Sequence, residues 1–136
     1  MAFKLGTQEA LDKPIARKVL LPVCNEAGTP VNHQITLLYH RMTVEEIGAA
    51  YAALGEDAKL LEELSGPALT AAVLDMHANH VLRLAVGWKE VQADDGTDAA
   101  FTFDNVRALL NAVPKAYDKI TEEFQKANRG GAALGN

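Results

Sequence analysis

The residues of this sequence that come closest to a metal-binding pattern lie near its middle. Asp75, His77 and His80 fall close together in a stretch whose apolar spacing predicts a helix. Side chains three positions apart share a helix face, so His77 and His80 could bind one metal ion together. The usual helical zinc signature spaces its histidines by four with a glutamate beside the first, and this stretch has neither. Histidines beside an apolar face are ordinarily packing residues, so we expect no metal and no other cofactor.

Two further patterns could carry chemistry. Cys24 with His33 or His40 could supply a nucleophile and a base, but Cys24 lies in a predicted strand without a helix N-terminus to lower its pKa. The acidic residues around Gly96 lack the twelve-residue pattern of a calcium loop and predict a solvated turn. The sequence contains no phosphate-binding glycine motif. We therefore predict no catalytic residues and expect a protein that is not an enzyme.

Large apolar side chains offer a different kind of site, for a protein partner. Trp88 is the single tryptophan, and tryptophan is common at the centre of interfaces. Alternatively, Trp88 is a core residue that positions the following segment on the long helix. Core packing is the commoner role of large aromatic residues near helix ends. Tyr117, Ile120 and Phe124 recur at helical spacing and could line a groove for a helical partner or pack in the core. These four residues are the partner-binding candidates.

Composition limits the classes of partner. The chain has 136 residues, with 13 Lys and Arg and 18 Asp and Glu, for a net charge of −5. This length is typical of one domain with its own core. The basic residues are scattered, which argues against nucleic acid as a partner. The N-terminus lacks the apolar core of a secretion signal, and charged residues interrupt the apolar stretch 67–88. We expect a soluble, intracellular protein that binds neither nucleic acid nor membrane.

The first elements that position these residues are two strands. Residues 19–24 and 31–39 flank a cluster of turn formers at 25–30, which predicts an antiparallel hairpin. Ile35, Leu37 and Tyr39 alternate with other residues and give the second strand one apolar face. Pro22 would remove a ladder hydrogen bond, so the first strand is expected at the edge of the sheet.

Helices follow the hairpin. Thr43 and Glu46 form a capping-box pattern, and Gly55 is expected to end the helix that begins there. A short acidic helix over 56–64 and a long helix over 67–86 come next, the latter with Pro67 in its first turn and Gly87 as its stop. The segments 88–91 and 100–103 are expected to pair as a second short hairpin. Helices that follow Thr102 and Pro114 complete the chain.

Together these elements predict an α+β fold, with a small N-terminal antiparallel sheet packed against a mainly helical remainder and a second short hairpin around residues 88–103. The expected organisation is a flexible arm over 1–17, a single domain over 18–128 and a disordered tail over 129–136. Neither the arm nor the tail has the apolar periodicity of a packed element.

Several short stretches occur in a characteristic order. They are Phe3-Lys4-Leu5, the turn at 25–28, Arg41-Met42-Thr43, Val86-Gly87-Trp88-Lys89-Glu90-Val91, Asp95-Gly96 and Phe101-Thr102-Phe103-Asp104-Asn105. With a helix broken at Pro114, a late Phe124 and a glycine-rich end, this order resembles the tail assembly chaperones of long-tailed bacteriophages over nearly the whole chain. Residues 7–18 and the pair His77 and His80 have no counterpart in that pattern.

The resemblance implies a binding protein without catalytic residues. Its partners would be the tape measure protein, which it keeps soluble, and the tail tube protein, whose subunits it helps to recruit. It would act in the host cytoplasm and be absent from the mature virion, and a homo-oligomer or a frameshifted longer form would be compatible with this role. Two alternatives stay open: a small structural phage or prophage protein of the head–tail or baseplate region, and a metal-binding protein that uses Asp75, His77 and His80.

Overall fold

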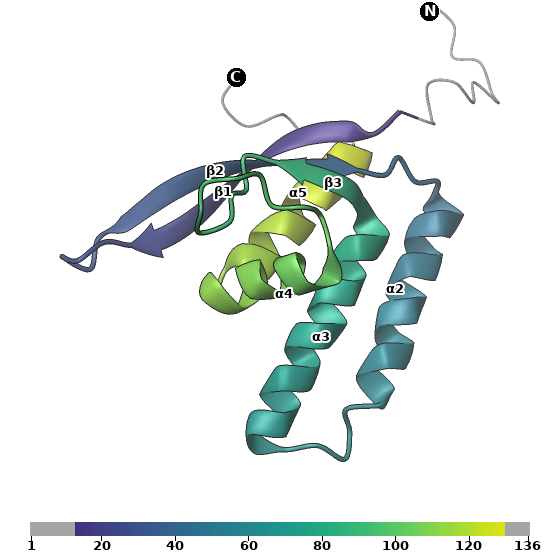
Figure 1. Ribbon diagram of the computed structural model, residues 1–136. Helices are drawn as coiled ribbons and strands as arrows, with labels where there is room; N and C mark the ends of the chain where they lie inside the picture. Colours follow the sequence, from purple (N-terminus) through teal and green to yellow (C-terminus); the bar gives the residue numbers. More distant parts are fainter. Residues whose placement is uncertain (1–12, 130–136) are drawn as a thin grey trace, which may run out of the picture.

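The computed structural model describes residues 13–129 and contains one small antiparallel sheet with helices on one of its faces (Figure 1). The elements, in chain order, are β1 (Ile15–Cys24), β2 (Pro30–Tyr39), α2 (Val44–Lys59), α3 (Gly66–Leu84), β3 (Ala85–Lys89), α4 (Phe103–Ala112) and α5 (Ala116–Arg129). The fold is α+β, as the sequence predicts. The expected arm and tail lie mostly outside the described residues, but Ile15 to Arg17 belong to β1 and Arg129 is the last residue of α5.

The sheet has the strand order β1-β2-β3, with β1 at an edge as expected. β1 and β2 pair over their full length, and the register places Val19 opposite Ile35 and Val23 opposite Val31. Because side chains alternate between the two faces of a strand, the odd-numbered residues of both strands form one row that faces the helices. The prediction of a hairpin with one apolar face is confirmed, and its strands begin earlier than the sequence indicated.

The turn between β1 and β2 shows which backbone groups point away from the hairpin. Asn25 N–H donates to the Thr29 carbonyl over 2.9 Å. Since hydrogen-bonded and non-hydrogen-bonded pairs alternate along an antiparallel ladder, the even-numbered residues point their N–H groups away from the partner strand. His40 N–H agrees, because it donates to Leu84 just before β3. Pro22 therefore costs no hydrogen bond between β1 and β2, contrary to the sequence argument, and its missing N–H lies on the free edge.

The first helix runs past the stop that the sequence predicted. Thr43 and Glu46 form the capping box, with both reciprocal hydrogen bonds present. α2 continues through Gly55 to Lys59, and turns rather than a separate helix over 56–64 follow it. A glycine ends a helix when its backbone is left-handed, and Gly55 does not have a positive φ. The predicted stop at Gly55 is wrong.

The long helix α3 begins with Gly66 at φ +60° and Pro67 in its first turn, as expected for Pro67. It ends at Leu84, two residues before the predicted end, and Gly87 lies inside β3 rather than stopping the helix. The helix ends early because of a tertiary contact: the residues after Leu84 form β3, which pairs with β2 and places Trp88 opposite Leu37. No sequence-local signal marks this change from helix to strand.

The second hairpin is shorter than predicted. Its closed part is a turn in which Gln92 bridges to Asp98 and Ala93 N–H donates to the Thr97 carbonyl over 2.8 Å. Trp88 pairs with β2 instead of with 100–103. Thr102 then caps α4, and Pro114 lies in the break between α4 and α5, as predicted.

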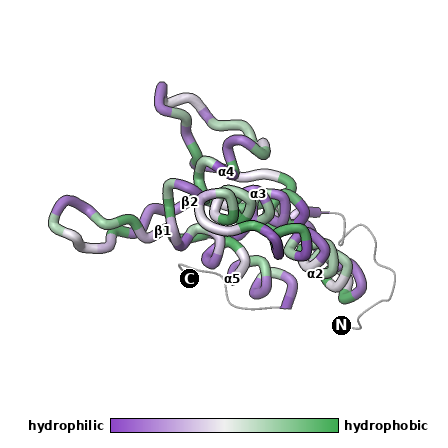
Figure 2. Tube along the Cα trace, turned by 90° about the horizontal axis from the view of Figure 1, so that it is seen from below, coloured by the Kyte–Doolittle hydropathy of each residue, from purple (hydrophilic) through white to green (hydrophobic). Residues whose placement is uncertain are grey.

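The core lies between the sheet and helices α3, α4 and α5, and α2 packs on the outside of α3 (Figure 1). The Tyr39 ring meets the edge of Phe124 at a centroid distance of 5.8 Å, and its hydroxyl donates to the Ile120 carbonyl over 2.6 Å. Seen from below, the β1–β2 hairpin reaches well beyond the helices (Figure 2). The outer end of the hairpin is thus outside the packed core.

Candidate partner-binding surface

The residues expected to be able to bind a metal are separated by their packing. Asp75 forms an ion pair with Arg107 of α4. The His77 ring stacks on Tyr117 of α5, with centroids 3.7 Å apart and planes 8° from parallel. Among residues 13–129, no group of three or more His, Cys, Asp or Glu side chains could hold a metal ion. The structure therefore gives these residues packing and ion-pair partners rather than a common ligand.

His80 is fully buried in the interface between α2 and α3. Its ring lies against Tyr51 of α2 at a centroid distance of 5.1 Å, and neither ring nitrogen has a hydrogen-bond partner within the described part of the chain. Burial first, and then the nearby Arg83 and His77, lower the pKa of His80 to about 4, against a smaller opposing effect of Asp57. At neutral pH this imidazole is uncharged and acts as a packing group.

The four partner-binding candidates lie mostly inside the molecule. Ile120 and Phe124 are fully buried, and Trp88 is 9% exposed. The Trp88 indole donates to the Ala99 carbonyl over 2.8 Å and meets Phe101 edge-on, so it fastens the 91–99 turn to the sheet. Tyr117 is half-buried, and its pKa is raised to about 12 by burial first and then by Tyr51 and Asp118. In this conformation, none of the four offers a large surface to a partner.

The other residues that the sequence suggested for catalysis or calcium binding also lie apart in the structure. The register places Cys24 opposite Pro30 and His33 opposite Leu21, so Cys24 and His33 are about 10 Å apart along the hairpin. Cys24 is exposed. Asp95 accepts hydrogen bonds from the Thr97 hydroxyl and N–H, which lowers its pKa and closes the turn around Gly96. No nucleophile with an adjacent base results from this arrangement.

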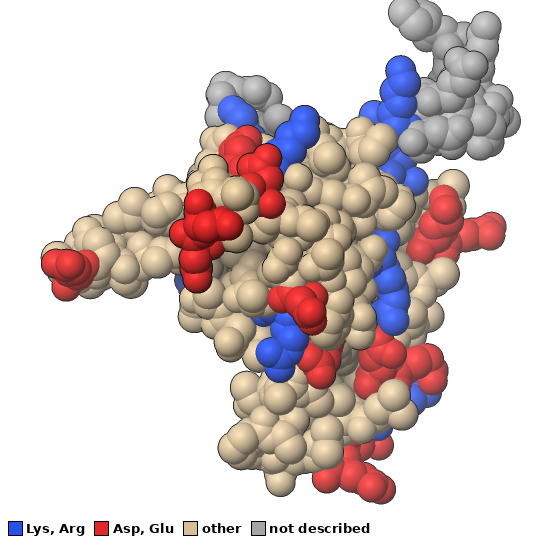
Figure 3. All heavy atoms as spheres, viewed as in Figure 1, with Lys and Arg blue, Asp and Glu red and all other residues tan. Residues whose placement is uncertain are grey.

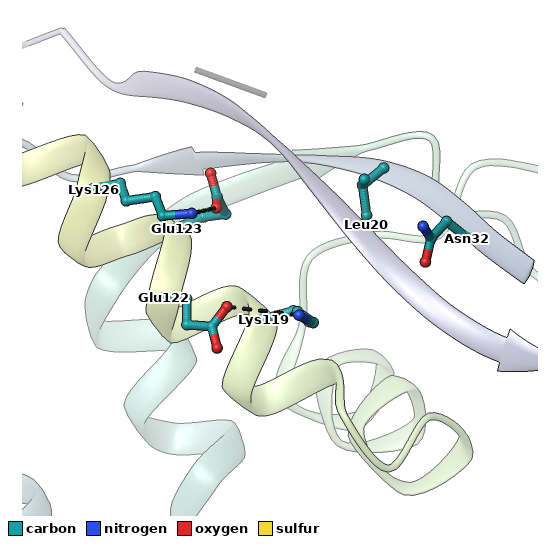
Figure 4. Close-up of a pocket in the computed structure, with 6 residues that line it drawn as sticks. All are labelled: Leu20, Asn32, Lys119, Glu122, Glu123 and Lys126. Atoms are coloured by element: carbon teal, nitrogen blue, oxygen red, sulfur yellow. Dashed lines mark ion pairs between the residues drawn. The ribbon is translucent and has the colours of Figure 1, made fainter. Parts of the chain in front are cut away.

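A polar hollow of about 150 Å³ lies between the hairpin and α5 (Figure 4). Its charged side chains pair with one another: Lys126 Nζ lies 3.2 Å from Glu123 and Lys119 Nζ lies 3.8 Å from Glu122. Glu123 also accepts from Arg17 over 2.8 Å, in an ion pair whose two side chains are 6% and 5% exposed. Charges that already neutralise one another leave little attraction for a charged ligand, so this hollow serves the attachment of α5 to β1.

An apolar groove lies at the outer end of the hairpin, with a volume of about 490 Å³. It is bounded by the hairpin on one side and by the junction of α4 and α5 on the other. Its lining residues are Pro22, Val23, Cys24, Pro30, Ala112, Val113, Pro114 and Lys115. Between its acidic tip and the body, the hairpin surface in Figure 3 carries neither acidic nor basic atoms. This groove is the candidate partner-binding surface.

The groove continues the row of core side chains into solvent. Along β1, Val19 and Leu21 are 0% and 3% exposed, and Val23, the next in the row, is 38% exposed. Its cross-strand neighbour Val31 is 41% exposed. The other large exposed apolar residues are scattered over α2, the turn after it and β3: Val44, Leu60, Leu64 and Val86. The first strand carried a sequence signal for the groove, because its apolar alternation continues from Val19 and Leu21 to Val23. On the second strand His33 interrupts the row between Ile35 and Val31. The sequence could not show that the helices end before this part of the hairpin.

A comparison with protein-family models matches one family over residues 4–136, and its description is phage tail assembly chaperone. No curated protein and no solved structure matches the chain. Among the described residues, no helix is long and apolar enough to cross a membrane.

Proposed function

The chain belongs to the phage tail assembly chaperone family, and we propose that it works by binding the tape measure protein of a long-tailed phage. It keeps the tape measure soluble and helps to recruit tail tube subunits around it. A long helical protein with exposed apolar stripes is prone to aggregate until the tube encloses it. A small protein with an apolar surface of its own can cover such stripes and be displaced later.

The observation that supports this role in the structure is the exposed apolar groove at the end of the hairpin. Val23 and Val31 continue the core row but stay about two-fifths exposed. Monomeric proteins seldom leave contiguous apolar surface open unless a partner covers it. The role is one of binding rather than catalysis, and we place it in the host cytoplasm, with neither nucleic acid nor membrane as partner.

The test is co-expression with the tape measure protein encoded in the same phage genome. The soluble fraction of the tape measure is measured after centrifugation, with and without this chain, and the chain is then used to pull the tape measure down. We expect the tape measure to move from the pellet to the supernatant and to copurify. A tape measure that stays insoluble, or is equally soluble beside an unrelated acidic protein, would contradict the proposal.

A second experiment addresses where the protein ends up. Purified phage particles are digested and searched for its peptides by quantitative mass spectrometry, with the tail tube protein as the internal reference. An assembly factor is expected to be absent from mature particles. Recovery in a fixed ratio to the tube protein would instead identify a structural component of the head–tail or baseplate region.

A further inference from the structure

We infer that the groove formed by the outer end of the β1–β2 hairpin and the α4–α5 junction holds an amphipathic helix of the partner, which presents an apolar stripe beside a carboxylate. This inference rests on the proposed function and names the surface that performs it. The apolar stripe packs on the valines and prolines of the groove, and the carboxylate pairs with Lys115.

The first argument is the interrupted burial of the hairpin. The row that is closed off from solvent at Val19 and Ile35 opens at Val23 and Val31, although the strands stay paired to their ends. The outer end of the hairpin is therefore held by the hydrogen bonds of its own ladder rather than by burial against the helices. An ordered apolar arm that overhangs the helices forms one wall of a groove, and Val113 and Pro114 form the other.

The second argument disfavours an added strand as the occupant. β1 has no strand on its outer side within the described residues, so strand addition is the obvious alternative. At the groove, however, the outward positions Pro22 and Pro30 carry no N–H, one on each edge of the hairpin. A strand laid along either edge there would miss the donor at the proline, and on the β1 side only the neighbouring Cys24 N–H would remain at the groove. A partner in this groove is held by side chains, which is how an amphipathic helix binds.

The third argument is charge. Lys115 is the one charged side chain that lines the groove, it is exposed, and no ion pair is formed with it by any described residue. A helix whose apolar stripe is flanked by Asp or Glu can pack on the valines of the groove and also pair with this ammonium group. A helix flanked by Lys or Arg would be repelled, so the groove selects among apolar helices by the sign of the flanking charge.

The decisive variant carries Val23→Asp and Val31→Asp. Val23 lines the groove and Val31 is its cross-strand neighbour, and both side chains are already partly exposed. The change therefore places one carboxylate in the groove and one beside it without burying either. The matched control carries Val44→Asp and Leu60→Asp, which are 87% and 79% exposed and lie at the two ends of α2. Circular dichroism and thermal melting of both variants establish that they fold. We expect binding of the tape measure protein to weaken roughly tenfold or more in the hairpin variant and to be unchanged in the control.

A direct contact test uses Cys24, the chain's single cysteine, which is exposed and lines the groove. A benzophenone maleimide is attached to Cys24, the complex with the tape measure is irradiated, and the cross-linked peptide is identified by mass spectrometry. The control carries the same probe at Lys59→Cys in a Cys24→Ser background. We expect cross-links from Cys24 alone, to a tape measure segment with an apolar stripe, heptad-like spacing and a flanking acid. Lys115→Glu should reduce this cross-link.

The outcomes separate the two proposals. If the unaltered chain fails to hold the tape measure, the proposed function is wrong. If it holds the tape measure and the hairpin variant holds it equally well, the function stands and this surface is wrong. Cross-links from Cys24 to a second copy of the chain, or to a tape measure segment with strand-like alternation, would also overturn the assignment of a partner helix to the groove.

Discussion

His80 shows how a single side chain can make the stability of this protein depend on pH. The ring is fully buried against Tyr51, with Tyr117, His77, Arg83 and Asp57 around it. Because the site excludes water and contains a cationic neighbour, it disfavours the imidazolium form. The cost of burying an imidazole without hydrogen-bond partners is tolerated because the ring fills space between α2, α3 and α5.

We predict that the free energy of unfolding falls as the pH decreases from about 6.5 to about 4. In this window the unfolded chain binds a proton at His80 and the folded chain does not, so acid favours the unfolded state. The shift corresponds to about 3 kcal/mol. Urea titrations at several pH values should show that His80→Leu flattens this dependence. An identical slope in His80→Leu would contradict the prediction.

A second buried side-chain interaction is the ion pair between Arg17 and Glu123, which joins β1 to α5. Arg17→Met leaves the Glu123 carboxylate with only the half-exposed Lys126 as partner. We expect a loss of about 3 kcal/mol of stability, measured by chemical unfolding, because the buried carboxylate loses its buried partner and keeps only one that is partly in solvent. Adding Glu123→Leu should recover most of this loss, and Lys126→Met alone should cost under about 1 kcal/mol. A double variant no more stable than the single one would refute this account.

Among the elements, α2 can be stabilised by a single substitution. Gly55 lies inside the helix, and a methyl group added there would meet no heavy atom within 4 Å. Gly55→Ala should therefore raise the free energy of unfolding by about 0.5–1 kcal/mol, because alanine loses less backbone entropy in a helix. Gly96→Ala is the contrasting case, since Gly96 has φ +84°, and it should lower stability. Thermal melts that show no gain for Gly55→Ala would count against this.

The elements also show how far the sequence could be interpreted. The capping box at Thr43, the edge position of β1, the start of α3 at Pro67 and the break at Pro114 depend on neighbours in the chain, and they were predictable. The end of α3 at Leu84 and the partner of Trp88 depend on β2, more than forty residues earlier, and they were not. The same holds for the candidate surface. Val23 and Val31 look like ordinary core residues until the position of α4 and α5 shows that nothing described covers them.

The whole molecule combines a packed centre with two less tightly held parts, the end of the hairpin and α2. The described residues of α2 bury one side chain, Ala50, and the helix is held to the rest mainly by Tyr51 and by the ion pair of Asp57 with Arg83. α3 and α5 each bury four residues. Local opening follows the number of buried apolar contacts, so α2 is expected at the low end of local stability.

We therefore predict that the amides of α2 exchange with solvent through local opening, before the molecule unfolds as a whole. Hydrogen exchange followed by mass spectrometry should give α2 peptides much lower protection than peptides of β2, α3 and α5. Asp57→Asn, which weakens the pair with Arg83, should lower the protection of α2 further and leave that of α5 unchanged. Equal protection of α2 and α3 would show that α2 is part of the central unit.

The register of β1 and β2 also limits how this hairpin can change during evolution. Inserting a single residue into β1 exchanges its two rows on one side of the insertion, which would turn core side chains such as Val19 and Leu21 towards solvent and bring Lys18 and Leu20 to the core. Adding two residues to each strand keeps both rows and lengthens the projecting part by about 7 Å. The reach of the hairpin can therefore evolve only in even steps, and each step leaves the core side chains where they are.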